Sequence, residues 1–200
     1  MPRTPAENER IRRATREQIL KATRELFFTK GYHATSIDDV AKEAQISKGL
    51  LYHYFKGKED LLAALVDLRI EDLLFVMNGA AAQKTPVEQI RHIIEGALED
   101  VRRQPEAFRF ELNLLTQPLL DPVAAKYSQK LIDERAKQFE VQTLMFQQLG
   151  VANPRKRSLY FSCTLQGIVL TFSTYPETFP LDDMKAQIID EFCEQSKRSV

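Results

Sequence analysis

Apolar residues recur along most of the chain at intervals of three and four positions, the period of a helix that packs on one side. Residues 8–30 show this pattern, with Ile11, Ile19, Ala22 and Leu26 on one face. Comparable stripes predict further helices over residues 58–82, 86–101, 105–117, 122–149, 154–175 and 181–196. No segment has a convincing strand pattern. With two short helices described next, the chain is predicted to be all-α with roughly nine helices.

Two short helices are predicted between residue 35 and residue 54. Either Thr35 or Ser36, each three residues before an aspartate, provides a capping-box start for a helix that ends near Ala44. Ser47 is a suitable N-cap for the second helix, which runs to about Tyr54. The tetrad from Ala44 to Ser47 remains as the turn. Two short helices joined in this way form a helix-turn-helix pattern.

The stretch GYHATSIDDVAKEAQISKGLLYHYFKGKEDL, residues 31–61, resembles the DNA-binding segment of TetR-family transcriptional regulators. The shared features are a Gly-aromatic corner, a Thr/Ser-capped helix, the motif SKGxLYxxF and a KExL start of a long helix. One position departs from the family pattern, because Gln45 stands where the turn usually has Gly and must adopt its conformation. The resemblance implies a helix-turn-helix domain over residues 1–58 and an all-helical ligand-binding and dimerisation domain over residues 59–200.

The second short helix has a composition suited to a DNA surface. Leu51 and Phe55 are four residues apart and can pack on the preceding helices. This leaves an outward face made of Lys48, Gly49, Tyr52 and His53. Exposed Lys and Tyr side chains beside a Gly that permits close approach suit the major groove and its flanking phosphates.

The family resemblance implies roles for individual residues. Thr35 and Ser36 would hydrogen-bond phosphate at one helix N-terminus and Lys58 at another, in addition to any capping role. The residues implied to approach base edges are Ser47, Lys48, Gly49 and Leu50. Those implied to pack on sugar and phosphate are Tyr52, His53 and Tyr54. Because Leu50 offers only apolar contact, specificity would come largely from Lys48 and DNA shape.

Arginines near the N-terminus leave two interpretations open. Arg3, Arg10, Arg12 and Arg13 form either an arm or helix face that touches DNA, or a solvated basic tail.

The larger half of the chain has no recognisable catalytic motif. It contains no GxSxG, HExxH or P-loop sequence and no paired carboxylates convincingly placed on one inner face, so no catalytic residue is predicted. Polar residues do interrupt its apolar faces, and a buried amide needs a partner, which is either a ligand or the protein itself. The candidate ligand-binding residues are Phe110, Asn113, Gln117, Tyr127, Phe139, Thr143, Phe146 and Gln166, the aromatic members being alternatively core residues.

The segment from Ser158 to Tyr175 carries no charge on any face, which one domain core cannot account for. In the resembling family the last two helices form a four-helix interface with their copies, which implies a homodimer with two recognition helices about 34–36 Å apart. The candidate interface residues are Gly167, Ile168, Thr171, Phe172, Ile188 and Phe192.

Formal charge separates the two halves. The whole chain has 28 Lys and Arg against 28 Asp and Glu, a net charge of zero. Residues 1–58 carry 12 basic and 7 acidic residues, whereas residues 59–200 carry 16 and 21. The neutrality is therefore a cancellation between a basic half suited to phosphates and an acidic half that stays off DNA.

Cysteine and histidine usage gives no sign of a cofactor. The two cysteines and three histidines are too scattered for a metal site, and none is predicted. The strongly apolar part of the uncharged run is shorter than the roughly 20 residues of a membrane span, and no signal peptide is recognised. We therefore expect a cytoplasmic protein with reduced thiols and no membrane partner.

Taken with the resemblance, these features predict a dimeric repressor. It would bind a palindromic double-stranded DNA operator and be released by a small apolar or amphipathic effector that tilts the long helix starting at Lys58. Two alternatives stay open. One is a DNA-binding regulator controlled by a protein partner without a ligand. The other is a helical enzyme, which would need titratable residues converging in the larger half, and its inner stripes offer few.

Overall fold

The computed structural model describes residues 4–116 and 122–194 of the chain, and all regular elements in these ranges are helices. The α-helices are α1 (Pro5–Thr29), α2 (Gly31–Ala34), α3 (Ile37–Glu43), α4 (Lys48–Tyr54), α5 (Lys58–Ala81), α6 (Pro86–Arg103), α7 (Pro105–Thr116), α8 (Pro122–Gln148), α9 (Pro154–Thr174) and α10 (Leu181–Ile189). The all-α prediction is confirmed. The additional helix is the single turn α2, which begins at the left-handed Gly31 with a φ of 82°.

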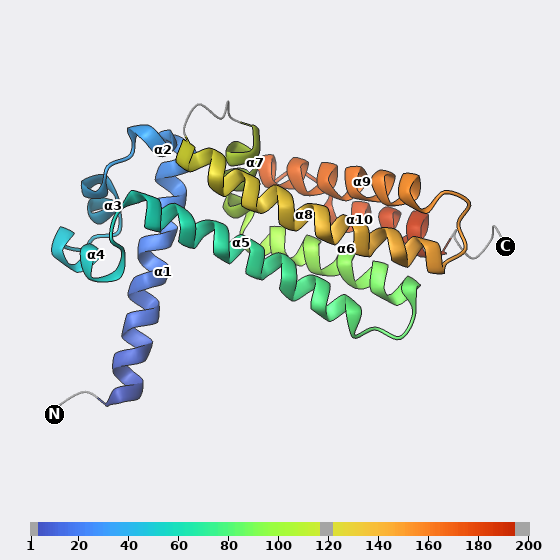
Figure 1. Cartoon of the computed structure of the whole chain (residues 1–200), viewed down its shortest axis with the longest axis horizontal. Helices are drawn as coiled ribbons and strands as arrows, with labels where there is room; N and C mark the ends of the chain where they lie inside the picture. Colours follow the sequence, from blue (N-terminus) through green and yellow to red (C-terminus); the bar gives the residue numbers. More distant parts are fainter. Residues whose placement is uncertain (1–3, 117–121, 195–200) are drawn as a thin grey trace.

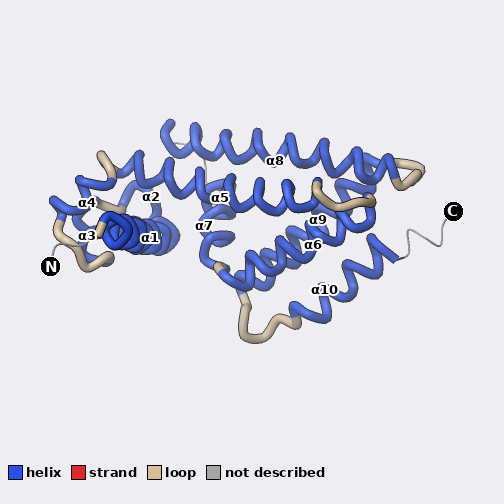
Figure 2. Tube along the Cα trace, turned by 90° about the horizontal axis from the view of Figure 1, so that it is seen from below, coloured by secondary structure: helices blue, strands red, loops and turns tan. Residues whose placement is uncertain are grey.

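Helices α1–α4 form a head at one end of an elongated molecule, and α5–α10 form a helical body (Figure 1). Helix α5 begins in the head and continues through the body, so one unbroken helix joins the two. The N-terminal half of α1 projects away from the body (Figure 1). Viewed at right angles, α1 is seen end-on beside α3 and α4, and α8 lies along the opposite edge from α10 (Figure 2).

Two hydrophobic clusters stabilise the fold. The first unites the head with the start of α5, and Phe110, Leu114 and Leu131 of the body also belong to it. The second fills the rest of the body between α5, α6, α8, α9 and α10. The predicted boundary at residue 58 coincides with the start of α5, but apolar packing continues across it. That division into domains stays a prediction.

The last helix differs from its predicted extent of 181–196. Helix α10 ends at Ile189 and continues as a π-helical turn, Asp190–Glu194, while Ser196 lies outside the described residues. The wider turn places the adjacent residues Phe192 and Cys193 both inside the body.

None of the helices in the described part of the chain is long and apolar enough to cross a membrane.

Candidate DNA-binding surface and ligand cavity

The helix-turn-helix is fixed by a small apolar core. Leu51 and Phe55 of α4 and its C-cap are buried, as predicted, together with Val40 of α3 and Ile19 of α1. The guanidinium of Arg16 covers the Phe55 ring at 5.5 Å from its centroid. Because α4 has only seven residues, its position depends on these packed side chains rather than on its own helical stability.

The turn between α3 and α4 is held by hydrogen bonds. Gln45 has a left-handed φ of 51°, so it does adopt the conformation that Gly would supply. The Gln18 side-chain amide donates to the carbonyl of Ala44 at 2.7 Å and attaches the turn to α1. The Ser47 hydroxyl accepts from the Leu50 backbone N–H at 3.1 Å, which confirms Ser47 as the N-cap of α4.

The outward face of α4 is accessible along its length. Tyr52 is 49% exposed and Leu50 40% exposed. The other exposed positions on this face are Ser47, Lys48, Gly49 and His53. Tyr54 differs, because it is half-buried against the head core with its ring edge-on to His53 at 5.7 Å. The structure therefore brings together on one surface most of the residues predicted to contact DNA.

Thr35 is a correction to the predicted set. It is only 1% exposed, and its hydroxyl donates to the carbonyls of Leu26 and Gly31 at 3.2 and 2.8 Å. A hydroxyl used in this way closes the corner between α1 and α3 and has no access to phosphate. The neighbouring Ser36 is exposed and remains the candidate at the N-terminus of α3.

Ser36 and Asp39 form the capping box of α3, which decides between the two predicted pairings. The Ser36 oxygen accepts from the Asp39 N–H at 3.1 Å, and the Ser36 N–H donates back to the Asp39 carboxylate at 2.9 Å. Hydrogen bonds from the Ser36 backbone and hydroxyl, together with Lys30, lower the pKa of Asp39 to about 2.

Both candidate lysines have partners within the head. Lys48 pairs with Asp38 at 2.9 Å across the exposed surface, and the carboxylate raises the pKa of the amine. Lys58 donates to the carbonyl of His33 at 3.1 Å and lies over the Tyr32 ring. A carbonyl and a ring leave the charge of Lys58 unneutralised, so it still adds to the positive potential of the head.

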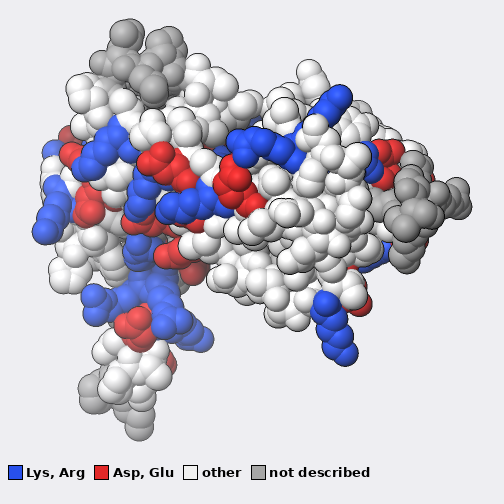
Figure 3. Space-filling model, turned by 45° about the vertical axis from the view of Figure 1, so that its right-hand side comes forward, with Lys and Arg blue, Asp and Glu red and all other residues white. Residues whose placement is uncertain are grey.

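Basic side chains also gather where the projecting α1 meets the rest of the molecule, on the face shown in Figure 3. Arg10, Arg12 and Arg13 are exposed, and Arg13 pairs with Glu9 in the same helix at 3.4 Å. Arg3 lies outside the described residues. Both interpretations of this basic segment therefore stay open.

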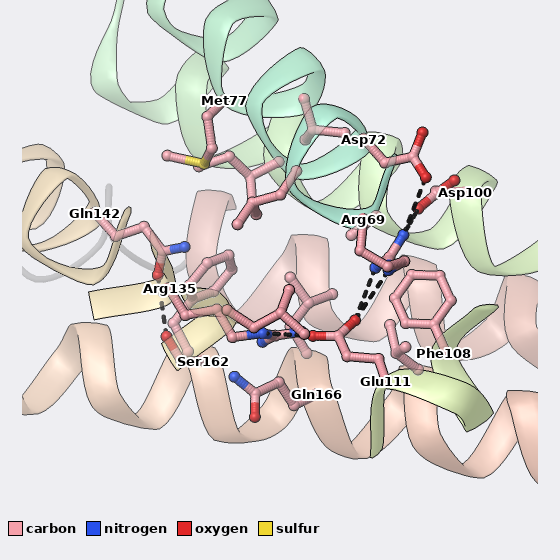
Figure 4. A pocket seen from close by; sticks show the side chains of 18 residues that line it. Arg69, Asp72, Met77, Asp100, Phe108, Glu111, Arg135, Gln142, Ser162 and Gln166 are labelled. Atoms are coloured by element: carbon pink, nitrogen blue, oxygen red, sulfur yellow. Dashed lines mark hydrogen bonds and ion pairs between the residues drawn. The ribbon is translucent and has the colours of Figure 1, made fainter. Parts of the chain in front are cut away.

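A cavity of about 120 Å³ lies inside the body and is lined by side chains from α5, α6, α7, α8 and α9 (Figure 4). Most of the wall is apolar. These lining residues are Leu73, Val76, Met77, Ile93, Ala97, Phe108, Leu131, Phe161, Leu165 and Val169. A cavity of this size and character is comparable with engineered apolar cavities of about 150 Å³ that admit benzene.

One end of the cavity is closed by a network of charged residues centred on Arg69 of α5 (Figure 4). Its guanidinium contacts the carboxylates of Glu111 at 3.0 Å, Asp100 at 2.9 Å and Asp72 at 3.3 Å. Arg135 of α8 binds the other oxygen of Glu111 through Nε at 2.7 Å. The network therefore ties four helices together at the cavity wall.

Mutual pairing keeps this network ionised. Burial alone would raise the pKa of Glu111, but Arg135 and Arg69 outweigh that effect and leave the pKa below its usual value. Burial likewise opposes the charged form of Asp100, whose pKa is nevertheless lowered by hydrogen bonds from Gln104 and by Arg69. These pKa shifts all lie away from neutrality, so the groups hold fixed charges near pH 7.

The expectation of few titratable residues in the larger half was therefore wrong, and so was the expectation that no carboxylates pair on an inner face. Asp72, Asp100 and Glu111 converge because α5, α6 and α7 each turn one acidic residue toward Arg69. A weak signal existed in the sequence, since Glu111 stands on an otherwise apolar face between Ala107 and Leu114.

The other end of the cavity is polar but uncharged. Gln142 of α8 accepts a hydrogen bond from the Ser162 hydroxyl of α9 at 3.0 Å, and Gln166 lies one helical turn further along α9 (Figure 4). Of the predicted ligand-binding residues that the structure describes, only Gln166 lines this cavity.

The other predicted ligand-binding residues lie elsewhere. Phe110 belongs to the first hydrophobic cluster and Phe146 to the second, where it packs against Phe161 and Phe192. The structure therefore supports the alternative interpretation of Phe110 and Phe146, that their rings belong to the hydrophobic core. Asn113 is half-buried on α7 and absent from the cavity lining, and Gln117 lies outside the described residues.

Three further candidates on α8 are absent from the cavity lining. Tyr127 reaches Glu59 through its hydroxyl at 3.3 Å. Arg155 covers the Phe139 ring, and the Thr143 hydroxyl donates to the Phe139 carbonyl at 2.9 Å. The residues of α8 that do line the cavity are Leu131, Arg135 and Gln142.

The predicted interface residues need a similar correction. Ile168, Phe172, Ile188 and Phe192 are buried within one chain and so are unavailable to a partner. Gly167 is exposed and Thr171 half-buried. The exposed face of α9 instead carries Leu159, Tyr160, Cys163, Gly167, Leu170 and Thr174 at helical spacing.

Contacts between head and body follow two routes. Helix α5 is common to both, and α7 packs on α1 through the Arg24–Glu106 pair at 3.5 Å and through Arg109 over the Phe28 ring. Helix α7 also contributes Phe108 and Glu111 to the cavity. A change in the cavity wall can therefore reach the head through α5 and α7.

Comparisons with known proteins agree with this architecture. A family model described as "Bacterial regulatory proteins, tetR family" matches residues 19–65. The transcriptional activator FasR of Mycolicibacterium smegmatis is 30% identical over 106 residues, 52% of this chain and 48% of FasR. The regulator UidR of Escherichia coli K12 is 36% identical over 87 residues, 44% and 41% of the two chains. The chain spans about half the length of the curated relatives it matches.

Solved structures extend the likeness to the whole fold. A TetR-like transcriptional regulator from Rhodococcus sp. RHA1 superposes with a TM-score of 0.74 at 18% identity, covering 93% of this chain and 97% of that one. The regulator FadR from Bacillus subtilis, solved in complex with stearoyl-CoA, gives 0.69 at 19% identity, covering 88% and 97%. The helix-turn-helix head thus matches the tetR family of bacterial regulatory proteins over residues 19–65, and the helical body shares the fold of TetR-like regulators.

Proposed function

We propose that the protein is a dimeric, sequence-specific DNA-binding repressor that leaves a palindromic operator when a small apolar or amphipathic ligand enters the body. One observation carries the proposal: a helix-turn-helix with an exposed α4 face is joined by the unbroken helix α5 to a ligand-sized cavity. The two functions thus share one structural element.

The DNA contacts are assigned to the head. Ser47, Lys48, Gly49 and Leu50 would approach base edges in the major groove, and Tyr52 with His53 would pack on sugar and phosphate. Supporting residues are Ser36, Tyr54 and Lys58. The pairing of Lys48 with Asp38 is exposed, so its net contribution to stability is small and exchange for a phosphate or base partner costs little.

The dimer is assigned to the exposed stripe of α9. Leu159, Tyr160 and Leu170 are large apolar residues left in solvent by the single chain, at 55, 52 and 41% exposure. Apart from the adjoining turns of α9 itself, no described residue comes within 4 Å of where a Cβ on Gly167 would lie, so a partner helix has room to approach there. An isologous contact along this stripe would present two heads to the two half-sites of a palindrome.

The ligand is assigned to the body cavity. A fold relative, FadR, was solved with stearoyl-CoA, which supports a partly apolar effector for this chain as well. The cavity of about 120 Å³ suits a smaller molecule in the conformation described, and a long acyl chain would require α8 and α9 to separate.

Release from DNA would use the two routes between cavity and head. A ligand that displaces the wall formed by Arg69 of α5 and Phe108 of α7 changes the angle at which both helices meet the head. The spacing of the two recognition helices in the dimer then no longer fits the operator. Couplings of this kind are typically about 1–3 kcal/mol.

The charged residues of the cavity do not favour an enzyme. General acid or base catalysis near pH 7 needs a group whose pKa lies close to neutrality. The shifts in Glu111, Asp100 and Arg69 run the opposite way, and each group is held by partners within the network. We therefore propose regulation without catalysis, in the cytoplasm where the DNA lies.

The test is selection of bound DNA from a random library by the full-length protein, followed by gel shifts on the selected sequence. The proposal expects a palindromic site whose half-site centres are one helical turn apart, and release of the DNA by compounds that bind the body. Recovery of no preferred sequence, or of a single unpaired half-site, would contradict it.

A further inference from the structure

The charged end of the cavity carries more negative than positive charge. Two guanidiniums, Arg69 and Arg135, face three carboxylates, Asp72, Asp100 and Glu111. Arg103 also contacts Asp100, but its side chain is 68% exposed and solvent screens its charge. Among the residues that line the cavity, carboxylates therefore outnumber guanidiniums by one.

Both cations of the wall are already bound. Glu111 uses one oxygen for Arg69 and the other for Arg135, and Arg69 further contacts Asp100 at 2.9 Å. A carboxylate ligand that drew either guanidinium away would leave the buried Glu111 with only one of its two partners. Breaking a buried pair in this way is strongly unfavourable.

The carboxylates are occupied as well. Asp72 accepts from Arg69 and from the Gln104 amide, and Asp100 accepts from Arg69 and the same amide at 2.8 Å. Both contacts of Asp72 fall on its Oδ2, so an ammonium ligand would share these carboxylates with donors that are already bound. It would lose its hydration in a site whose remaining wall is apolar.

The uncharged end offers a hydrogen bond to a ligand. Because the Gln142 oxygen accepts from Ser162, its amide NH₂ is left to donate, and it points toward the space between Met77 and Arg135 (Figure 4). A hydroxyl, carbonyl or ether oxygen is the complement of that donor. The apolar wall on either side would cover the rest of such a molecule.

We propose that the cavity selects small, uncharged, mostly apolar molecules with one oxygen acceptor, and rejects ions of the same carbon skeleton. The inference rests on the proposed function, because it defines the effector that the body senses. Benzyl alcohol is a suitable probe, since a cavity of about 120 Å³ is close in size to cavities that admit benzene. Toluene, benzoate and benzylamine are its matched relatives.

The experiment titrates each probe into the full-length dimer by isothermal titration calorimetry at pH 7. Benzyl alcohol is expected to bind at least about tenfold more tightly than benzoate and benzylamine. The inference is overturned if either ion binds as tightly as the alcohol. It is also overturned if none of the four probes binds.

Two variants sharpen the assignment to this cavity. Gln142→Leu should weaken the binding of benzyl alcohol about fivefold or more and leave the affinity for toluene unchanged, because only the alcohol uses the amide donor. Asp72→Asn should increase the affinity for benzoate, because it removes one negative charge from the cavity lining, and should leave the affinity for toluene unchanged. Asp67→Asn, on the same helix but paired with Lys130 outside the cavity, is the matched control and should change neither.

A gel shift on the selected operator separates the two proposals. Binding of benzyl alcohol without loss of DNA would contradict effector release and leave the selectivity of the cavity intact. DNA binding with no uptake of any probe would overturn the selectivity and leave the DNA-binding function intact. Unchanged benzoate affinity in Asp72→Asn, in a variant that unfolds at the wild-type temperature, would contradict the charge argument.

Discussion

The head and the body distribute their residues in opposite ways. In the head, apolar residues such as Leu51 and Val40 are buried, and no described charged residue is fully buried, although the Arg24 side chain is only 13% exposed. In the body, Arg69, Asp100 and Glu111 are buried, while Leu159 and Leu170 face solvent on α9. The head thus keeps to the usual pattern of buried apolar and exposed charged residues. The body departs from this pattern in two ways, by burying charged residues and by exposing large apolar ones.

Each departure coincides with a proposed binding function. Buried charges need partners, and those of the body line a cavity. Exposed large apolar residues mark association surfaces, and those of α9 form one stripe. The comparison teaches that the proposed DNA contacts use exposed residues on a stable frame, whereas the proposed ligand and partner sites of the body use residues that are unfavourable where they lie in the single chain.

The largest expected effect concerns the buried network. Glu111→Ala leaves Arg69 and Arg135 without their shared carboxylate, so we expect the free energy of unfolding to fall by about 3–5 kcal/mol. The measurement is urea unfolding at fixed protein concentration. Glu140→Ala, which removes an exposed pair with Arg155, is the control and should cost at most about 1 kcal/mol. Equal losses in the two variants would remove the distinction between the network and the surface.

The next effect tests the apolar stripe of α9. Leu170→Asp places a charge in the proposed contact, so the free energy of dimerisation should become less favourable by about 2 kcal/mol or more. Sedimentation equilibrium measures this change. Phe75→Asp changes a residue that is 80% exposed on α5, off the stripe, and should leave the dimer unchanged. Dissociation caused by Phe75→Asp rather than Leu170→Asp would place the interface elsewhere.

A smaller effect tests the head. Tyr52→Ala and Lys58→Ala should each weaken DNA binding by about 1–2 kcal/mol for all sequences, because both residues are proposed to contact the sugar-phosphate backbone of DNA. Lys58→Ala should also reduce the slope of log affinity against log salt by about one. Fluorescence anisotropy at several salt concentrations measures both quantities. Lys84→Ala, in the body, is the control. Unchanged DNA affinity in both head variants would contradict the assignment of the DNA contacts to the head.

The smallest effect concerns the turn. Gln45→Gly should stabilise the protein by about 0.5–1 kcal/mol, because φ at this position is 51° and Gly adopts it without strain. Gln45→Ala, which keeps a Cβ and loses only the amide, should give no such gain. Thermal unfolding of the two variants compares them directly. A destabilised Gly variant would show that the Gln45 side chain contributes more than its backbone costs.

Local features of the head were predictable from the sequence. The Ser47 cap, the turn and the buried pair Leu51 and Phe55 depend on residues within a few positions of one another. The error at Thr35 arose because two adjacent hydroxyls both precede an aspartate, and only tertiary contacts with α1 decide which one is buried.

The body was predictable as a set of helices but not as a site. Its cavity forms where residues from five helices meet, so spacing within a single helix could not identify Arg69 or Arg135 as lining residues. From Ser158 onward helix α9 is uncharged on every side, so the pattern predicted contacts on two sides but not which face points inward. Gln166 was found because an amide stands out in such a helix.

The central claim is that one molecule couples the cavity to the DNA-binding head. The most direct test is the affinity of the selected operator for the wild-type dimer with and without saturating benzyl alcohol, measured by fluorescence anisotropy. We expect saturating benzyl alcohol to lower the operator affinity about 5- to 150-fold, and bound operator to lower the affinity for benzyl alcohol by the same factor. Unchanged operator affinity at saturating, calorimetrically verified ligand would contradict it.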